Sequence, residues 1–150
     1  MATNVAPTGL AKDLAERADA GKPVRIGLVG SGEMGTDIVT RAAMMDGVEV
    51  AAISEINVPN AHKAVEIAHQ EAGHSQNVST TDALNAAIED GKCAITDNVD
   101  ALLDSGLIDV VIDATGIPAV GADIGMTAKR TVWASSTALA RATSPPLAWS

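Results

Sequence analysis

Over the first 128 residues, the apolar positions follow two patterns in turn along the chain. Short, nearly continuous apolar runs are typical of strands buried on both faces of a parallel sheet. Segments whose apolar residues recur three or four positions apart are typical of amphipathic helices. The predicted strands are residues 24–29, 48–54, 93–96 and 107–116, and the predicted helices are residues 10–18, 34–45, 60–73, 80–92, 97–106 and 118–128. This order favours the α/β class, with a parallel sheet built by right-handed crossovers and preceded by an N-terminal helix.

One segment, RIGLVGSGEMGTDIV at Arg25–Val39, has glycines in the turn between the first predicted strand and the helix that follows it. Gly30, Gly32 and Gly35 have the spacing G-x-G-x-x-G. In dinucleotide-binding proteins the first glycine permits a tight turn, the second admits the pyrophosphate to the backbone, and the third lets the helix pack on the strand. The strand–helix–strand context therefore predicts a Rossmann-type doubly wound sheet that binds a dinucleotide. The alternative is a turn that needs glycine for its conformation alone.

The residues between these glycines complete the predicted phosphate loop, and we count Ser31, Glu33 and Met34 among the candidate cofactor-binding residues. Backbone N–H groups at the start of a helix, together with the partial positive charge there, attract phosphate groups. The charge of Glu33 complements the helix dipole but would repel a pyrophosphate if the side chain pointed inward. We therefore expect the Glu33 side chain to point outward, toward solvent or a missing domain.

An acidic residue stands where the ribose of a bound dinucleotide is expected. Glu55 lies twenty residues after Gly35 and directly follows the second predicted strand. A carboxylate there accepts hydrogen bonds from the adenine ribose and repels a 2′-phosphate. Glu55 therefore favours NAD over NADP, and no arginine stands beside it to bind a 2′-phosphate. The alternative is an acid in a solvated loop.

The last predicted strand ends in Asp-Ala-Thr-Gly, with Thr115 and Gly116 at its carboxyl end. Ligands of doubly wound sheets bind at the carboxyl ends of the strands. These two residues are thus candidates for the nicotinamide side of the site. The alternative is an ordinary turn between a strand and a helix.

The charge of the chain limits its partners. The net charge of −9 argues against nucleic acid or an acidic membrane surface. The sequence contains no apolar run of about 18 residues, which a membrane-spanning helix would need, and no basic start followed by an apolar stretch, as in a secretory signal. A single cysteine, Cys93, excludes an internal disulfide. These features favour a cytoplasmic protein.

We expect no metal site. His62, His69 and His74 are separated by seven and five residues, so they do not share one helical face, and no cysteine cluster accompanies them. They are interpreted as exposed helix residues, and Cys93 as a small core residue.

Residues 24 to about 128 resemble the N-terminal domain of the homoserine dehydrogenase-like family of NAD(P)-binding oxidoreductases. The resemblance is carried by RIGLVGSGEMGTDIV, LIDVVIDATGIPAVGADIGMTA and the N-terminal helix GLAKDLAERADAGKP. Within the family the chain is most similar to the 1-deoxy-D-xylulose 5-phosphate reductoisomerase-like branch. The resemblance implies reduction or oxidation of a small hydroxy or carbonyl compound, with substrate and dimerisation segments after the cofactor domain. For that branch it implies NADPH, from which Glu55 departs.

The tail departs from this pattern at about Lys129. It contains no Asp or Glu, whereas residues 1–123 hold all 19, and it contains both tryptophans. It is rich in Ala, Ser, Thr, Arg and Pro, as expected for GC-rich codons read out of frame. We interpret it as an out-of-frame or disordered tail of a truncated product. The sheet is then expected to lack a strand at its late edge, the edge next to the last predicted strand. The alternative is a genuine divergent tail.

The sequence thus predicts three regions: an N-terminal helical extension at 1–23, an NAD(P)-binding Rossmann domain at 24–128 and the atypical tail at 129–150. The expected function is the dinucleotide-binding part of an NAD(P)-dependent oxidoreductase, in which only the full-length parent binds the small-molecule substrate. No catalytic residue is assigned. The alternatives are a non-catalytic nucleotide-binding module and an inert remnant.

Overall fold

The computed structural model describes residues 8–70, 73–117, 119, 122 and 132–135 of the 150-residue chain. The elements follow one another as α1 (Leu10–Asp19), β1 (Val24–Val29), α2 (Glu33–Ala43), β2 (Val48–Ser54), α3 (Val58–His69), β3 (Ser75–Asn77), α4 (Thr81–Glu89), β4 (Cys93–Thr96), α5 (Val99–Leu103), β5 (Val110–Asp113) and β6 (Val132–Ser135). The described helices include none long and apolar enough to span a membrane.

The strands form one sheet in the order β3-β4-β2-β1-β5-β6. All its neighbouring strands pair in parallel. The chain begins in the middle of the sheet at β1, extends through β2 toward one edge and later returns to β5 on the other side of β1. The direction of strand addition therefore reverses beside β1. This arrangement is the Rossmann-type doubly wound fold that the sequence predicts.

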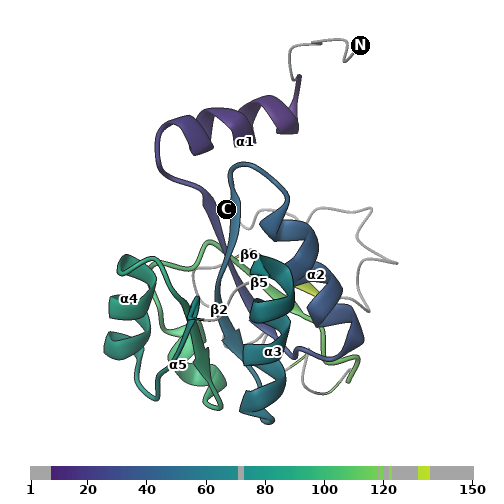
Figure 1. Cartoon of the computed structure of the whole chain (residues 1–150), viewed down its shortest axis with the longest axis vertical. Helices are drawn as coiled ribbons and strands as arrows, with labels where there is room; N and C mark the ends of the chain where they lie inside the picture. The colour runs from purple at the N-terminus through teal and green to yellow at the C-terminus, as the bar shows by residue number, and fades with distance from the viewer. Residues whose placement is uncertain (1–7, 71–72, 118, 120–121, 123–131, 136–150) are drawn as a thin grey trace, which may run out of the picture.

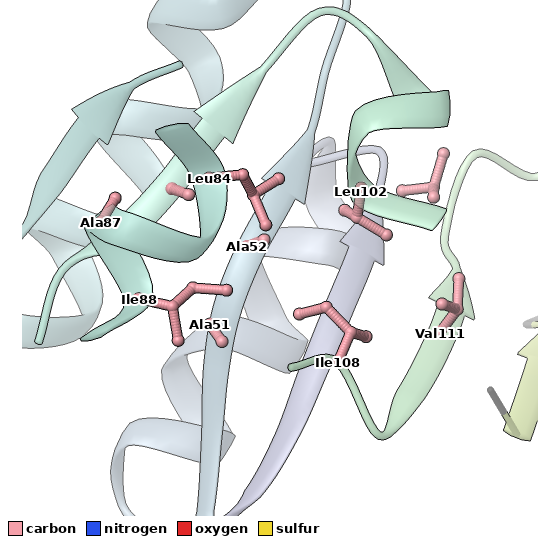
Figure 2. Packing of buried hydrophobic residues seen from close by; sticks show 10 residues of the cluster. Ala51, Ala52, Leu84, Ala87, Ile88, Leu102, Ile108 and Val111 are labelled. Carbon is pink, nitrogen blue, oxygen red and sulfur yellow. The ribbon is translucent and has the colours of Figure 1, made fainter. Parts of the chain in front are cut away.

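Helices cover both faces of the sheet (Figure 1). On one face, residues of α4 and α5, including Leu84 and Leu102, pack with Ala52 and Val111 of the strands, as Figure 2 shows. On the other face, residues of α2 and α3, among them Val39 and Val65, pack with Leu28, Ile53 and Ile95. Successive strand residues serve opposite faces because strand side chains alternate. Without Phe or Tyr, the core is aliphatic, and each large buried side chain contributes about 1.5–3 kcal/mol.

Helix α1 confirms the predicted N-terminal helix but contributes no buried residue. It lies apart from the two helical layers, next to the turn that connects α2 with β2 (Figure 1). Its contact with that turn is close, because a Cβ atom added at Gly47 would lie 2.0 Å from the Leu14 carbonyl oxygen. Gly47 also has a φ of +79°, which glycine adopts without strain.

Two strands differ from the sequence expectations. β3 was not predicted, because Ser-Gln-Asn carries no apolar signal and forms only a short edge strand. β6 lies within the tail that we expected to leave the late edge of the sheet without a strand. It pairs with β5 from Val110↔Val132 to Asp113↔Ser135 and thereby extends that edge. Most of the predicted helix at 118–128 lies outside the described residues.

Candidate nucleotide-binding site

A cavity of about 450 Å³ lies at the carboxyl ends of the central strands. It is lined by Val29, Gly30, Gly32, Ser54, Glu55, Ile56, Asp97, Val99, Ala114, Thr115 and Ile117. These residues follow or end β1, β2, β4 and β5, so the cavity occupies the position beside β1 where the strand order reverses. Doubly wound sheets bind their ligands at this position. The cavity brings together four of the residues singled out in the sequence: Gly30, Gly32, Glu55 and Thr115.

The three glycines of the loop are in different environments. Gly30 has a φ of +88°, and a Cβ atom there would lie 3.1 Å from the Thr115 backbone nitrogen. A Cβ atom at Gly35 would lie 2.3 Å from the Gly30 carbonyl oxygen, so the fold itself requires glycine at both positions. A Cβ atom at Gly32 would meet no atom of the described residues within 4 Å. A purely conformational turn accounts for Gly30 and Gly35, but no described neighbour or positive φ requires a glycine at Gly32.

Helix α2 begins directly at this open space. Gly32 is its N-cap, and no side chain accepts a hydrogen bond at that cap. The N–H groups of the first turn are therefore available to an anion, which the helix dipole also favours. Glu33 and Met34 are both exposed and do not line the cavity. The exposure of the Glu33 side chain agrees with the expected outward orientation.

Glu55 directly follows β2 and is tied to the glycine loop. Its Oε2 accepts hydrogen bonds from the Ser31 backbone N–H at 2.6 Å and from the Ser31 hydroxyl at 2.9 Å. Its Oε1 accepts one from the Asn57 backbone N–H at 3.1 Å. Burial raises the pKa of Glu55, but the hydrogen bonds from Ser31 and Asn57 outweigh burial and lower the pKa below its ordinary value of 4.5. Glu55 is thus a half-buried, ionised carboxylate held at the rim of the cavity.

The turn after β5 depends on a residue to which the sequence analysis gave no role. Asp113 is 1% exposed, and its Oδ1 accepts hydrogen bonds from the Thr115 N–H at 2.9 Å and from the Thr115 hydroxyl at 2.6 Å. Aspartate often closes a turn in this way with the residue two positions later. Asp113 therefore fixes Thr115 at the cavity. Gly116 has a φ of +70°, is exposed and does not line the cavity.

Other lining residues were also missed by the sequence analysis. Asp97 directly follows β4, just as Glu55 follows β2, so the rule that found Glu55 could have found Asp97. Ile56 is 94% exposed although it is a large apolar residue, and it lines the cavity next to Glu55. In the sequence, only the position of Ile56 directly after Glu55 indicates that it lies at this site.

The histidines and the cysteine lie elsewhere. His62 is half-buried and bridges α3 to β3, with Nδ1 at 2.6 Å from Ser75 Oγ and Nε2 at 2.5 Å from Asn77 Oδ1, so the expectation of an exposed residue is wrong for His62. His74 is also half-buried and lies outside the helices, directly before β3, so the expectation of an exposed helix residue is wrong for His74 as well. The rings of His69 and His74 stack with centroids 4.6 Å apart. Burial and then the charge of Glu49 raise the pKa of the Cys93 thiol to about 12. In the described part of the chain, no cluster of three or more His, Cys, Asp or Glu could hold a metal ion.

Comparison with protein-family models and with curated protein sequences finds no match. Among solved structures, the chain is similar to myo-inositol dehydrogenase from Lactobacillus casei, solved in complex with NAD(H) and myo-inositol. The TM-score is 0.52 at 22% sequence identity, and the match covers 75% of this chain and 28% of that enzyme. This similarity supports the Rossmann-type fold. The chain spans less than a third of the length of that dehydrogenase.

Proposed function

We propose that the chain binds a nicotinamide dinucleotide in the cavity at the carboxyl ends of β1, β2 and β5. In this proposal it is the coenzyme-binding part of an oxidoreductase that acts on a small hydroxy or carbonyl compound. The observation that carries the proposal is the open space at Gly32, at the start of α2 and within a cavity of about 450 Å³. A dehydrogenase solved with NAD(H) that shares the fold supports the same class.

The predicted binding residues divide between the parts of the coenzyme. The loop formed by Gly30, Ser31, Gly32, Glu33, Met34 and Gly35 approaches the pyrophosphate, with the backbone N–H groups at the start of α2 as its donors. Glu55 accepts a hydrogen bond from the adenine ribose, and Thr115 lines the nicotinamide side, with Gly116 in the turn that follows it. The coenzyme, when bound, supplies the hydride chemistry, and the chain's part is to hold and orient it.

The electrostatics of the cavity favour NAD over NADP. Glu55 is ionised, and Asp97 adds a second carboxylate to the lining. The described residues that line the cavity include no Lys or Arg that could bind a 2′-phosphate. The two carboxylates would therefore repel NADP, although the reductoisomerase-like resemblance implies NADPH. We propose NAD as the preferred coenzyme. We also propose that the chain belongs to the homoserine dehydrogenase-like family.

A non-catalytic nucleotide-binding module is the second candidate. On the nicotinamide side, the cavity is lined by Ala114, Thr115 and Ile117, none of which is an acid or base that could move a proton at neutral pH. The parent activity thus needs residues beyond those of this site. Binding of NADH without turnover of small aldehydes and ketols would favour the module.

The test of coenzyme binding uses two alanine variants of the full chain. Gly32→Ala places a methyl group where the pyrophosphate would lie, while Gly106→Ala places one in equally open space before β5, at the opposite ends of the strands. We expect wild type and Gly106→Ala to bind NADH equally in a fluorescence titration, and Gly32→Ala to bind about 10- to 100-fold more weakly at unchanged thermal stability. Equal binding by both variants, or no binding by wild type, would overturn the proposal.

A further inference from the structure

The hydrogen bonds of Glu55 define how much of its carboxylate remains for a ligand. An ionised carboxylate offers about four lone-pair positions. Oε2 accepts two hydrogen bonds from Ser31 and Oε1 accepts one from the Asn57 N–H, and the Ile56 backbone N–H adds a further hydrogen bond that lowers the pKa of the carboxyl. Both hydrogen bonds from Ser31 go to Oε2, so Oε1 is the oxygen that Ser31 does not occupy. A ribose hydroxyl can therefore bond to Oε1 without breaking either contact with Ser31, provided that the carboxylate keeps this orientation.

Ser31 is arranged to hold that orientation rather than to contact a phosphate. Ser31 is 3% exposed as a residue and is not among the residues that line the cavity. A hydroxyl group has one hydrogen to donate, and that of Ser31 is directed at Glu55 Oε2, 2.9 Å away. While this bond stands, the hydroxyl has no hydrogen for the pyrophosphate. A charge-assisted bond of this kind is also stronger than a bond between neutral groups.

We propose that Ser31 is a positioning residue, which clamps the Glu55 carboxylate to the glycine loop so that one oxygen faces the ribose of the coenzyme. The proposal rests on the proposed function, because it deepens the account of the same site. The clamp also keeps the negative charge where a 2′-phosphate would arrive, since a pinned carboxylate does not rotate away from it. Ser31 therefore adds to the preference for NADH over NADPH by acting through Glu55.

The experiment measures the dissociation constants of the full chain for NADH and NADPH. In Ser31→Ala we expect NADH to bind about three- to tenfold more weakly while NADPH binds no more weakly than to wild type, so that the preference falls. Ser31→Thr keeps the hydroxyl and should restore the preference. Ser105→Ala is the matched control, because Ser105 is 4% exposed and its hydroxyl bonds to Asn85 at 2.5 Å, in the segment between α5 and β5. The control should leave both constants unchanged.

A double-mutant cycle separates positioning from direct contact. In a Glu55→Ala background, adding Ser31→Ala should leave the NADH constant unchanged, because no carboxylate remains to be held. Equal weakening of NADH and NADPH by Ser31→Ala, or the same weakening in the Glu55→Ala background, would show that Ser31 acts on the shared pyrophosphate and would overturn the inference while coenzyme binding stands. Failure of wild type to bind either nucleotide would instead overturn the proposed function.

A measurement without nucleotide tests the clamp itself. NMR titration of the Glu55 carboxyl should give a higher pKa in Ser31→Ala than in wild type, because one of the hydrogen bonds that lower the pKa is lost. An unchanged pKa would contradict the clamp whatever the nucleotide titrations show.

Discussion

The two ends of the strands in this sheet are built for different tasks. At the carboxyl ends, Gly32 opens onto empty space and the Glu55 carboxylate is held by N–H and O–H donors of neutral groups. At the amino ends, Gly47 is in close contact with α1, and Arg25 pairs with Glu49 at 3.0 Å. Gly47 and the Arg25–Glu49 pair at the amino ends thus make contacts within the chain. At the carboxyl ends, the N–H groups at the start of α2 and the Glu55 carboxylate border the cavity described above, which is why we expect the nucleotide site there.

The largest expected effect on stability comes from Gly35→Ala. A Cβ atom there would lie 2.3 Å from the Gly30 carbonyl oxygen, and neither backbone segment can retreat because β1 is central in the sheet. We expect a loss of about 3 kcal/mol in the free energy of unfolding, measured by urea denaturation. A loss below about 0.5 kcal/mol would show that the loop is less tightly packed than described.

Gly47→Ala is the counterpart at the amino ends. The added methyl group meets the Leu14 carbonyl at 2.0 Å, but α1 contains no buried residue and can move away. The remaining cost is the positive φ, about 1–2 kcal/mol. Folded Gly47→Ala should bind NADH as wild type does. Weaker binding would contradict the proposal that the coenzyme contacts only the carboxyl ends of the strands.

Acid should weaken coenzyme binding through Glu55. Because the pKa of Glu55 is lowered by folding, its contribution to stability is present above pH 4.5 and is lost as the pH falls through the lower pKa of the folded state. The affinity for NAD⁺ that depends on the carboxylate should therefore stay constant from pH 7 to 4.5 and fall at lower pH. Glu55→Gln should bind NADH more weakly at pH 7 and lack this decline. Titrations should use the oxidised coenzyme at low pH, because NADH decomposes in acid.

The smallest effect is expected from Arg25→Ala. The Arg25–Glu49 pair is partly exposed, with side-chain exposures of 30% and 45%. Such pairs contribute about 0–1 kcal/mol. Thermal denaturation should show a slight loss of stability, and NADH affinity should not change, since this pair lies at the ends of the strands that face away from the cavity.

Local signals account for the parts of the molecule that the sequence predicted. The apolar run of β1, the glycine spacing and the acid at the end of β2 each depend on neighbours within a few residues, so the fold class and Glu55 could be identified from the chain alone. Ser31 was named as a phosphate-loop residue, but its bond to Glu55 joins positions 24 residues apart and depends on the pairing of β1 with β2.

The missed features lack such local signals. β3 is short and polar, and β6 is a strand of a tail whose composition suggested none. Asp113 was visible in the sequence, but its burial and its bonds to Thr115 became apparent only in the folded turn. The interpretation of residues 129–150 as an out-of-frame product stays a prediction, and sequencing of the gene beyond codon 128 would test it.

The most direct test of the central claim is a ¹H–¹⁵N spectrum of the full chain recorded during addition of NAD⁺. We predict that the amide signals of Gly30, Gly32 and Thr115 shift together along one binding curve, while those of Gly47 and Gly106 at the amino ends stay in place. A saturable response at Gly47 and Gly106 without one at Gly32, or no saturable response at any of these amides, would contradict the account.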